Sequence, residues 1–253
     1  MQTDERRKAI LQLLEEQNSI SVAILSKKFS VSPVTIRKDL EALEKSLMVT
    51  RTRGGVILAK AAPAPPFISR AELHFEEKML IAKTAAEMVE DDDSILLDSG
   101  TTTLAIARQL LNRQKLTVVT NSLPIAYTFG NSNVNVMLTG GTLLGTQMSL
   151  IGPETEEYLS RIQVNKLFLG ASGVRGTMGL TTSSSLEAQV KRQMIKVAKK
   201  VILVADHSKF NSTSIVLFAD FKQIDCVITT QPLDDSFLQH FNKLGIEVIY
   251  ATK

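Results

Sequence analysis

Residues 31–40 read VSPVTIRKDL, a pattern typical of a helix with one apolar side and one polar side. Ser32 belongs to the residue types that cap helix N-termini, and Pro33 suits the first helical position, where its missing N–H is not needed. Ile36 and Leu40 are one turn apart, so they lie on the same face and can anchor the helix to a core. The other faces of these turns carry side chains that donate hydrogen bonds: Thr35, Arg37 and Lys38.

A shorter helix is predicted just before this stretch. Residues 21–29 (SVAILSKKF) place Val22, Leu25 and Phe29 on one side, and Ser30-Val31 leaves only a tight turn between the two helices. Two helices joined in this way form a helix-turn-helix, whose second helix enters the major groove of DNA. The same pattern also fits an ordinary helical hairpin with a solvated basic face.

The residues around this pair of helices favour DNA binding. Residues 48–58 (MVTRTRGGVIL) hold two short β-prone runs joined across a basic Gly-Gly turn, which predicts a β-hairpin. With a first helix over residues 4–17, the arrangement is a winged helix-turn-helix, expected over residues 1–58. The residues expected to contact DNA are Ser32, Thr35, Arg37, Lys38, Arg51 and Arg53.

The distribution of charge agrees with this interpretation. Residues 1–60 hold 11 Lys or Arg and 7 Asp or Glu, a net charge of +4. Residues 61–253 hold 18 Lys or Arg and 19 Asp or Glu, a net charge of −1. The two parts together give the total of +3. The basic excess therefore lies in the part that would meet DNA phosphates.

Length and composition predict a second, larger domain. The chain has 253 residues, 44% of them hydrophobic and 22% charged, as in soluble globular proteins. No apolar run approaches the roughly 18 residues of a membrane span, and the N-terminal sequence MQTDERRKAI lacks the apolar segment of a signal peptide, so a cytoplasmic protein is expected. The single cysteine, Cys226 in the run CVIT, excludes an intramolecular disulfide and is expected to be a small buried hydrophobe.

A proline-rich stretch separates the two domains. Residues 59–66 read AKAAPAPP, and three prolines within four residues cannot continue a helix, so a linker is expected over residues 59–75. From residue 76 to residue 253, apolar strands alternate with helical segments, which predicts an α/β domain with a mainly parallel sheet. Strands are expected at 94–97, 116–119, 134–138, 166–169, 201–204, 215–218, 226–229 and 247–250. Helices are expected at 76–89, 103–111, 123–129, 154–160, 185–198 and 234–244.

Polar loops follow the strands of this domain, and ligands of such sheets collect at the carboxyl ends of the strands. The loops read DSGTTT (98–103), TNS (120–122), TGGT (139–142), GASGV (170–174) and DHSKF (206–210). Each alone fits a simple turn. Together they predict one polar pocket, in which the hydroxyls of Ser99, Thr101 and Thr102, a helix N-terminus and the Lys209 cation suit a phosphate or another anion. No nucleotide fingerprint is present, and His74, His207 and His240 lack the spacing of metal ligands, so neither a cofactor nor a metal site is predicted.

Both parts of the chain carry a family resemblance. VSPVTIRKDLEALE followed by TRTRGGV resembles the DNA-binding end of the DeoR (deoxyribose-operon repressor) family, with Ser46 and Arg53 where that pattern usually has Gly and His. DSGTTT, VVTNS, TGG, LFLGASGV, Glu187 with Lys191, and DHSKF resemble the effector-sensing domain of that family, which is related in fold to pentose-phosphate isomerases and coenzyme A transferases.

The resemblance implies a DNA-binding transcriptional regulator, commonly a repressor of a sugar-utilisation operon, whose hold on operator DNA changes when it binds a sugar phosphate. It implies that the following residues bind the effector: Asp98, Ser99, Gly100, Thr101, Thr102, Asn121, Gly140, Gly141 and Lys209. For Glu187 and Lys191, an i,i+4 pair on a solvated helix face is an equally good explanation.

A sugar-phosphate isomerase or transferase with an N-terminal helical extension is the alternative. Isomerases of this fold carry an acidic pair in the loop that here reads Gly170-Ala-Ser-Gly173, and Asp98 is the one carboxylate clearly placed among the loops, so no catalytic residues are predicted. An activator built from the same parts is a further possibility. The expected partners are operator DNA, a phosphorylated sugar or polyol, and further copies of the chain in a dimer or tetramer, but no membrane.

Overall fold

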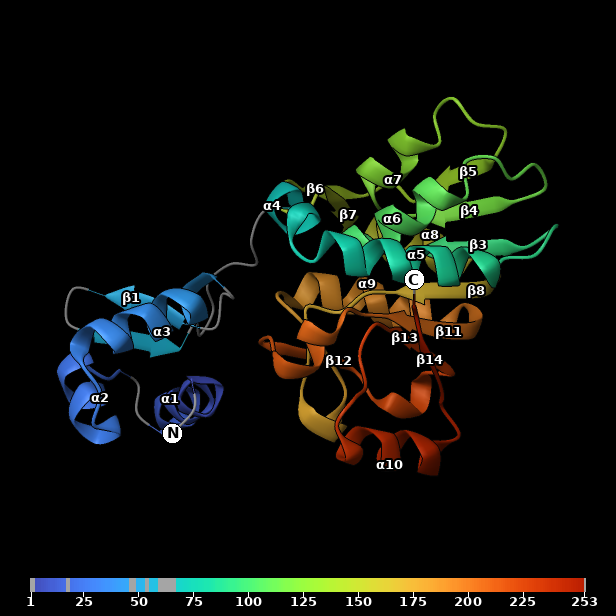
Figure 1. The fold of residues 1–253 in the computed structure, drawn as a ribbon. Helices are drawn as coiled ribbons and strands as arrows, with labels where there is room; N and C mark the ends of the chain where they lie inside the picture. Colours follow the sequence, from blue (N-terminus) through green and yellow to red (C-terminus); the bar gives the residue numbers. More distant parts are fainter. Residues whose placement is uncertain (1–2, 17–18, 46–48, 53–54, 59–66, 253) are drawn as a thin grey trace. The chain divides into compact units, whose positions relative to one another are not determined.

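A computed structural model describes residues 3–16, 19–45, 49–52, 55–58 and 67–252 (Figure 1). The chain divides into two compact units, Met1–Ala62 and Pro63–Lys253, and each is described below by itself. The linker expected over residues 59–75 is too long, because Phe67–Glu72 forms helix α4 of the second unit and Phe67 is buried in its core. Residues 59–66 lie outside the described residues.

The first unit contains three helices and a hairpin among its described residues. These are α1 (Thr3–Glu16), α2 (Val22–Phe29), α3 (Pro33–Lys45), β1 (Val49–Thr52) and β2 (Gly55–Leu58). Ser21 caps α2 by accepting a hydrogen bond from the Ile24 N–H, and Ser30 ends it in the left-handed conformation, with a φ of 53°. The predicted helix-turn-helix and hairpin are therefore present.

One apolar cluster holds the first unit together. Its fully buried members include Ile10 and Leu14 of α1, Leu25 of α2, Ile36 and Leu40 of α3, and Val56 of β2. Val22 and Phe29, expected to point inward, are half-buried and pack against it. Val56 of β2 pairs with Ile20, and a side chain on Gly55 would come within 2.5 Å of the Ile20 carbonyl oxygen, so this close approach requires glycine.

A buried ion pair fixes α3 against α1. Arg6 Nε donates to Asp39 Oδ2 at 2.6 Å, and Arg7 Nε donates to Asp39 Oδ1 at 3.2 Å. Asp39 is 2% exposed and Arg6 6% exposed, so this carboxylate faces inward while its neighbours Arg37 and Lys38 face outward.

The second unit is built on a parallel sheet of seven strands. These are β3 (Ser94–Leu97), β4 (Thr117–Thr120), β5 (Asn135–Leu138), β8 (Val164–Leu169), β11 (Ala198–Val204), β13 (Cys226–Thr229) and β14 (Glu247–Tyr250). They lie in the order β14-β13-β11-β8-β3-β4-β5, and all neighbours are parallel. The predicted α/β class is confirmed.

Helices cover both faces of this sheet, which is why its strands read as continuous apolar runs. The helices are α5 (Phe75–Glu87), α6 (Thr101–Gln109), α7 (Leu123–Thr128), α8 (Pro153–Ser160), α9 (Ser185–Lys196) and α10 (Asp235–Leu244). In β3, Ile95 and Leu97 pack with α5, α6 and α7, while Leu96 packs on the other side with α8, α9 and α10. Cys226 is fully buried in the first of these two layers, as expected. No described helix has the length and apolar character to cross a membrane.

Shorter elements surround the sheet. They are β6 (Thr142–Leu144), β7 (Ser149–Ile151), β9 (Gly173–Val174), β10 (Leu180–Thr182), β12 (Val216–Ala219), η1 (Gly176–Met178), η2 (His207–Asn211) and η3 (Phe221–Gln223). The strand expected at 215–218 corresponds to β12, which pairs antiparallel with β10 in a small separate sheet and not with the main one. The β6–β7 hairpin and strands β9 and β10 were not expected.

Candidate functional site

The outer face of α3 is the candidate DNA-reading surface. Arg37 and Lys38 are exposed on the side opposite the buried Ile36. Ser32 Oγ accepts a hydrogen bond from the Thr35 N–H at 3.1 Å, so this hydroxyl caps the helix in the structure. An exposed cationic helix face fixed from behind is the arrangement that a major groove accepts.

The wing residues can be placed only in part. Arg51 lies in β1, where it pairs with Val56, and its side chain is outside the described residues. Arg53 lies outside the described residues altogether. The backbone of the hairpin is thus in the position expected for a wing, and the role of its two arginines stays a prediction.

In the second unit, the polar loops meet at the carboxyl edge of the sheet. Asp98 follows β3, Asn121 follows β4 and Gly170 follows β8, and these three strands are neighbours. Asp98 and Asn121 border a pocket too narrow for a water molecule, whose full lining is Asp98, Ser99, Asn121, Ile151, Glu187, Val190 and Lys191. Three of the five loops that were expected to form one pocket therefore lie close together, with the Gly170 N–H joined to Asp98 by a hydrogen bond.

Two of the lining residues form an ion pair. Asp98 Oδ2 accepts hydrogen bonds from Lys191 Nζ and from the Gly170 N–H, the latter at 3.0 Å. Lys191 Nζ also donates to the Gly170 carbonyl oxygen at 3.1 Å. Both charged side chains are almost fully buried, so the solvated helix-face interpretation of Lys191 is wrong.

Two buried acceptors in the pocket are left without a donor. Among the described residues, nothing donates to Asp98 Oδ1 or to Asn121 Oδ1, although both atoms are buried. The Asn121 amide points its own N–H group at the Leu150 carbonyl oxygen, at 2.9 Å, which orients the oxygen the other way. Buried acceptors in native proteins are normally satisfied, so this pair suits a ligand that donates hydrogen bonds, such as one with hydroxyl groups.

The start of α6 supplies donors on the same loop. Thr101 and Thr102 are buried in its first turn, where N–H groups have no partner within the helix. Thr103 closes the loop by donating to the Asp98 carbonyl oxygen and accepting from the Gly100 N–H. The loop is therefore held in a fixed shape with its first-turn N–H groups available to an anion.

Lys191 is the cation that lines the pocket among the described residues, and Arg70 interacts electrostatically with Asp98 and Glu187 beside it. Lys78 interacts in turn with Arg70 and Lys209. Burial lowers the pKa of the Arg70 guanidinium, and the negative charges of Glu187 and Asp98 oppose this effect. Burial lowers the pKa of Lys78 to about 8, assisted by repulsion from Lys209 and Arg70 and opposed by Asp206. Cations held so close together, at a cost in electrostatic energy, suit an anionic ligand.

Gly140 and Gly141, which were expected to bind the effector, lie outside the pocket lining. They form an exposed turn before β6, with φ values of 60° and 119°, and they do not line the pocket. A side chain on Gly141 would come within 2.2 Å of Thr155 Oγ1, so the turn itself accounts for glycine here. Gly100, Thr101, Thr102 and Lys209 are likewise not among the lining residues, but the first three continue the Asp98 loop.

Comparison with known proteins identifies both units. The model of the DeoR-like helix-turn-helix domain matches residues 6–62, and the model of the DeoR C-terminal sensor domain matches residues 73–231. The chain belongs to the DeoR family. It is a member of a family of DNA-binding transcriptional regulators, as its sequence predicted.

Several relatives are similar to this DeoR-family protein over nearly its whole length. The HTH-type transcriptional regulator IolR of Bacillus subtilis is 34% identical, covering 92% of this chain and 93% of the relative. The glycerol-3-phosphate regulon repressor of Escherichia coli K12 is 33% identical, covering 94% and 95%. The putative aga operon transcriptional repressor of Escherichia coli O157:H7 is 34% identical, covering 98% and 93%. Among solved structures, the ribose 5-phosphate isomerase A of Methanocaldococcus jannaschii is similar over 55% of this chain and 53% of its own, with 19% identity and a TM-score of 0.39.

The sequence analysis did not identify two buried or partly buried cations of the second unit, Arg70 and Lys78. Arg70 lies in the stretch interpreted as linker, and its guanidinium lies 5.7 Å from the Phe67 ring centroid and donates to Gln147. The burial of Lys78 could have been predicted from the sequence, because Lys78 falls on the apolar side of the predicted helix with Ile81 and Ala85. In the structure it is 5% exposed. Its Nζ donates to the carbonyl oxygens of Arg70 and Leu73, which ties α4 to α5.

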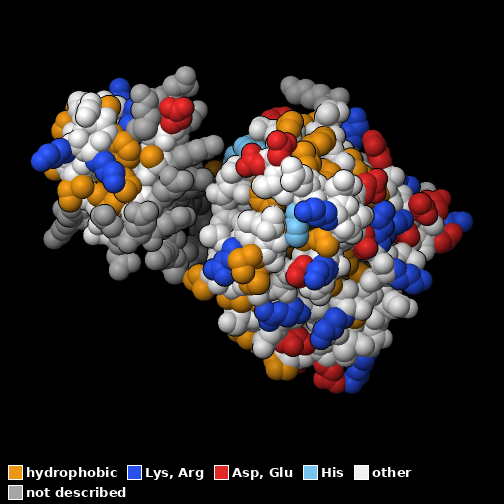
Figure 2. Space-filling model, turned by 90° about the horizontal axis from the view of Figure 1, so that it is seen from below, with side chains coloured by type: hydrophobic (Ala, Val, Ile, Leu, Met, Phe, Trp, Pro, Cys, Tyr) orange, Lys and Arg blue, Asp and Glu red, His pale blue; other side chains and the backbone are white. Residues whose placement is uncertain are grey.

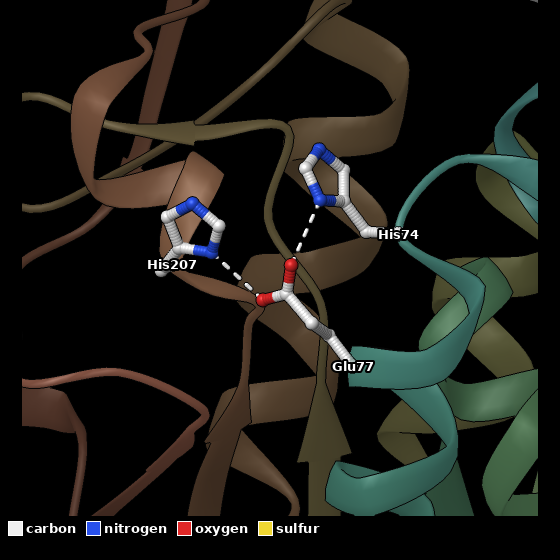
Figure 3. A group of neighbouring side chains, drawn as sticks. All are labelled: His74, Glu77 and His207. Carbon is white, nitrogen blue, oxygen red and sulfur yellow. Dashed lines mark hydrogen bonds and ion pairs between the residues drawn. The ribbon is translucent and has the colours of Figure 1, made fainter.

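The histidines of this DeoR-family chain are not all scattered, so that prediction is wrong for two of them. His74 Nδ1 lies 2.9 Å from Glu77 Oε1, and His207 Nδ1 lies 2.7 Å from Glu77 Oε2 (Figure 3). Burial acts to raise the pKa of Glu77, but hydrogen bonds from Thr230, His207 and His74 outweigh it and lower the pKa to about 2. His240 lies elsewhere, with its ring centroid 6.0 Å from that of Phe221.

Proposed function

We propose that this DeoR-family regulator represses a sugar- or polyol-utilisation operon and that a phosphorylated sugar or polyol controls its hold on operator DNA. The observation that supports this most is the pair of unsatisfied buried acceptors, Asp98 Oδ1 and Asn121 Oδ1, beside buried cations. Hydroxyl groups would satisfy the acceptors, and a phosphate would neutralise the cations.

The phosphate is best placed at the start of α6. The first-turn N–H groups of Thr101 and Thr102 and the positive end of the helix would hold it, with Lys209 and Lys78 as countercharges. In Figure 2, acidic and basic side chains are interspersed over the visible face of the second unit.

Binding would disturb the ion pair that lines the pocket. Lys191 spans the space to Asp98, so a ligand that reaches Asp98 must displace it or share it. Arg70 lies in the electrostatic field of Asp98 and Glu187, and its helix α4 is the first described element after the residues that join the two units. We infer that effector binding acts on α4 through Arg70 and in this way changes DNA binding.

The effector is bound and released unchanged in this proposal. The loop 170–173 holds no carboxylate, Asp98 is paired with Lys191, and Glu187 accepts a hydrogen bond from Ser183 Oγ at 2.6 Å. A carboxylate engaged in this way is a poor general base. The chain would work on operator DNA in the cytoplasm as a dimer or tetramer, because a helix-turn-helix reads paired half-sites.

A ligand screen tests the proposal directly. The full chain is heated with each of a panel of phosphorylated sugars and polyols, and with the unphosphorylated form of each compound. A ligand that binds only the native state raises the free energy of unfolding, by about 2.7 kcal/mol at a concentration one hundred times its Kd. The unfolding temperature therefore rises. The proposal requires one phosphorylated member to do so and its unphosphorylated partner to do so far less; a panel without any such member contradicts it.

A further inference from the structure

We propose that His74, Glu77 and His207 form a binding site for a divalent transition-metal ion, with Zn²⁺ as the best match. The inference does not depend on the proposed effector or on DNA binding. It rests on the arrangement of these three side chains, which come from two segments more than a hundred residues apart.

The ligand atoms are already gathered. One atom from each of the three side chains lies within 4.8 Å of the other two, and the Glu77 carboxylate stands between the two imidazole rings (Figure 3). Ligand atoms placed tetrahedrally around Zn²⁺, with bonds of about 2.0–2.1 Å, are about 3.3 Å apart. His74 Nδ1 lies 2.9 Å from Glu77 Oε1 and His207 Nδ1 lies 2.7 Å from Glu77 Oε2, so each imidazole nitrogen is already near that spacing from one carboxylate oxygen.

The backbone holds His74 in an unusual conformation for this purpose. His74 has a φ of 53°, in the left-handed region that non-glycine residues rarely adopt. It occupies the N-cap position of α5 but its side chain does not cap the helix, because the ring is turned toward Glu77. Histidine enters this region more readily than most residues, and here the conformation accompanies the contact of the ring with Glu77.

A neighbouring residue orients the carboxylate. Thr230, which follows β13, donates its hydroxyl to Glu77 Oε2. Metal-binding carboxylates typically have such an outer partner, which fixes the direction of their lone pairs. The cluster therefore has both the inner ligands and one supporting contact of a metal site.

The ligand chemistry and the exposure favour zinc with one open position. Two imidazole nitrogens and one carboxylate oxygen form a common three-ligand zinc set, in which water takes the fourth position. The side chains of His74, Glu77 and His207 are 38%, 20% and 32% exposed, so an ion and its water can enter. Ca²⁺ and Mg²⁺ prefer sites made of oxygen ligands, so neither is expected to compete here.

The proposed ion would connect two parts of the sensor unit. His74 and Glu77 lie at the start of α5, and His207 begins η2, which also carries Lys209. An ion bound by all three would fix η2 to α5 and hold Lys209 near Lys78. Binding of the ion should raise the free energy of unfolding of the chain.

The test is a zinc titration of the full chain, prepared without a polyhistidine tag and freed of metal with a chelator. Binding is followed by competition with a chromogenic chelator. We expect one Zn²⁺ per chain, and we expect His74→Gln and His207→Gln each to weaken binding by at least about tenfold. His240→Gln is the matched control and should bind as the parent does, because His240 lies apart from the cluster against Phe221.

A second readout uses the parent protein alone and does not depend on the folding of any variant. Zn²⁺ should raise the unfolding temperature of the parent, and Co²⁺ in its place should give the strong visible absorption of a tetrahedral site. Zinc binding weaker than a Kd of about 1 mM, or a Co²⁺ spectrum without tetrahedral character, overturns the proposal. Equal losses of affinity in His207→Gln and His240→Gln, both still folded by circular dichroism, overturn it as well.

Discussion

Lys191 Nζ donates a hydrogen bond to Asp98 Oδ2 across 93 residues of sequence, and both side chains are almost completely buried. The pair joins α9 to the loop after β3, and both of its side chains line the pocket. A buried ion pair is costly to break from one side, because the remaining charge has neither water nor a partner. This relationship gives the first prediction.

Lys191→Met should destabilise the chain by about 3–5 kcal/mol, because it leaves the Asp98 carboxylate buried and uncompensated. The double variant Asp98→Asn, Lys191→Met removes both charges and should recover at least about half of that loss. Urea unfolding of the parent, the single variant and the double variant measures both values. If the double variant is no more stable than Lys191→Met, the charges of Asp98 and Lys191 do not stabilise each other as the structure indicates.

Arg37→Ala and Lys38→Ala should each weaken binding of a specific DNA duplex, because both cations lie on the exposed face of α3. A contact to a base edge is worth about 1–3 kcal/mol and would relax specificity at one position, whereas a phosphate contact would lower the affinity for all sequences and reduce the salt dependence. Fluorescence anisotropy at matched salt distinguishes the two. Lys222→Ala, an exposed cation of the second unit, is the control, and undiminished binding by the double variant Arg37→Ala, Lys38→Ala would refute the assignment.

Lys209→Ala should raise the effector concentration needed to change DNA binding and leave the ligand-free affinity for DNA nearly unchanged. Lys209 repels the buried Lys78, and a charge-assisted hydrogen bond to a phosphate is typically worth about 1.5–3 kcal/mol. Effector titrations of the DNA complex, with Lys222→Ala alongside, give the comparison. An effector response in Lys209→Ala identical to that of the parent would remove Lys209 from the phosphate site.

Arg70→Gln should separate effector binding from the effect on DNA. Its guanidinium stacks over Phe67, donates to Gln147 and lies in the field of Asp98 and Glu187, so α4 loses its charged link to the pocket in this variant. We expect the thermal shift caused by the effector to persist while the change in DNA affinity becomes several times smaller. An unchanged DNA response would show that α4 is not the coupling element.

Local sequence signals predicted much of the fold. Ser32, Pro33 and the Ile36–Leu40 spacing are sufficient to define α3, and alternation of apolar runs with helices is sufficient to predict a parallel sheet. Capping and periodicity act within a few residues, so one sequence reveals them. The loop Asp98–Thr103 could be assigned to the carboxyl edge of the sheet for the same reason.

Most of the features that were not predicted depend on contacts between distant segments. Nothing near Lys191 in the sequence indicates that it pairs with Asp98, and nothing near His207 indicates His74. Arg70 was lost because the prolines before it suggested a linker that continued through α4. The strand at Val216–Ala219 was assigned to the main sheet because its apolar run does not reveal its partner, β10.

The most direct test of the central claim combines both units in one measurement. A DNA duplex that the full chain binds is selected from a random pool, and its complex is titrated with the phosphorylated sugars and polyols while anisotropy is recorded. The account predicts that one of these compounds changes the affinity for the duplex, that its unphosphorylated form does not at the same concentration, and that Asp98→Asn requires more of it. Selection of no specific duplex, or a complex that no phosphorylated compound alters while NMR shows steady conversion of one of them, would contradict the account.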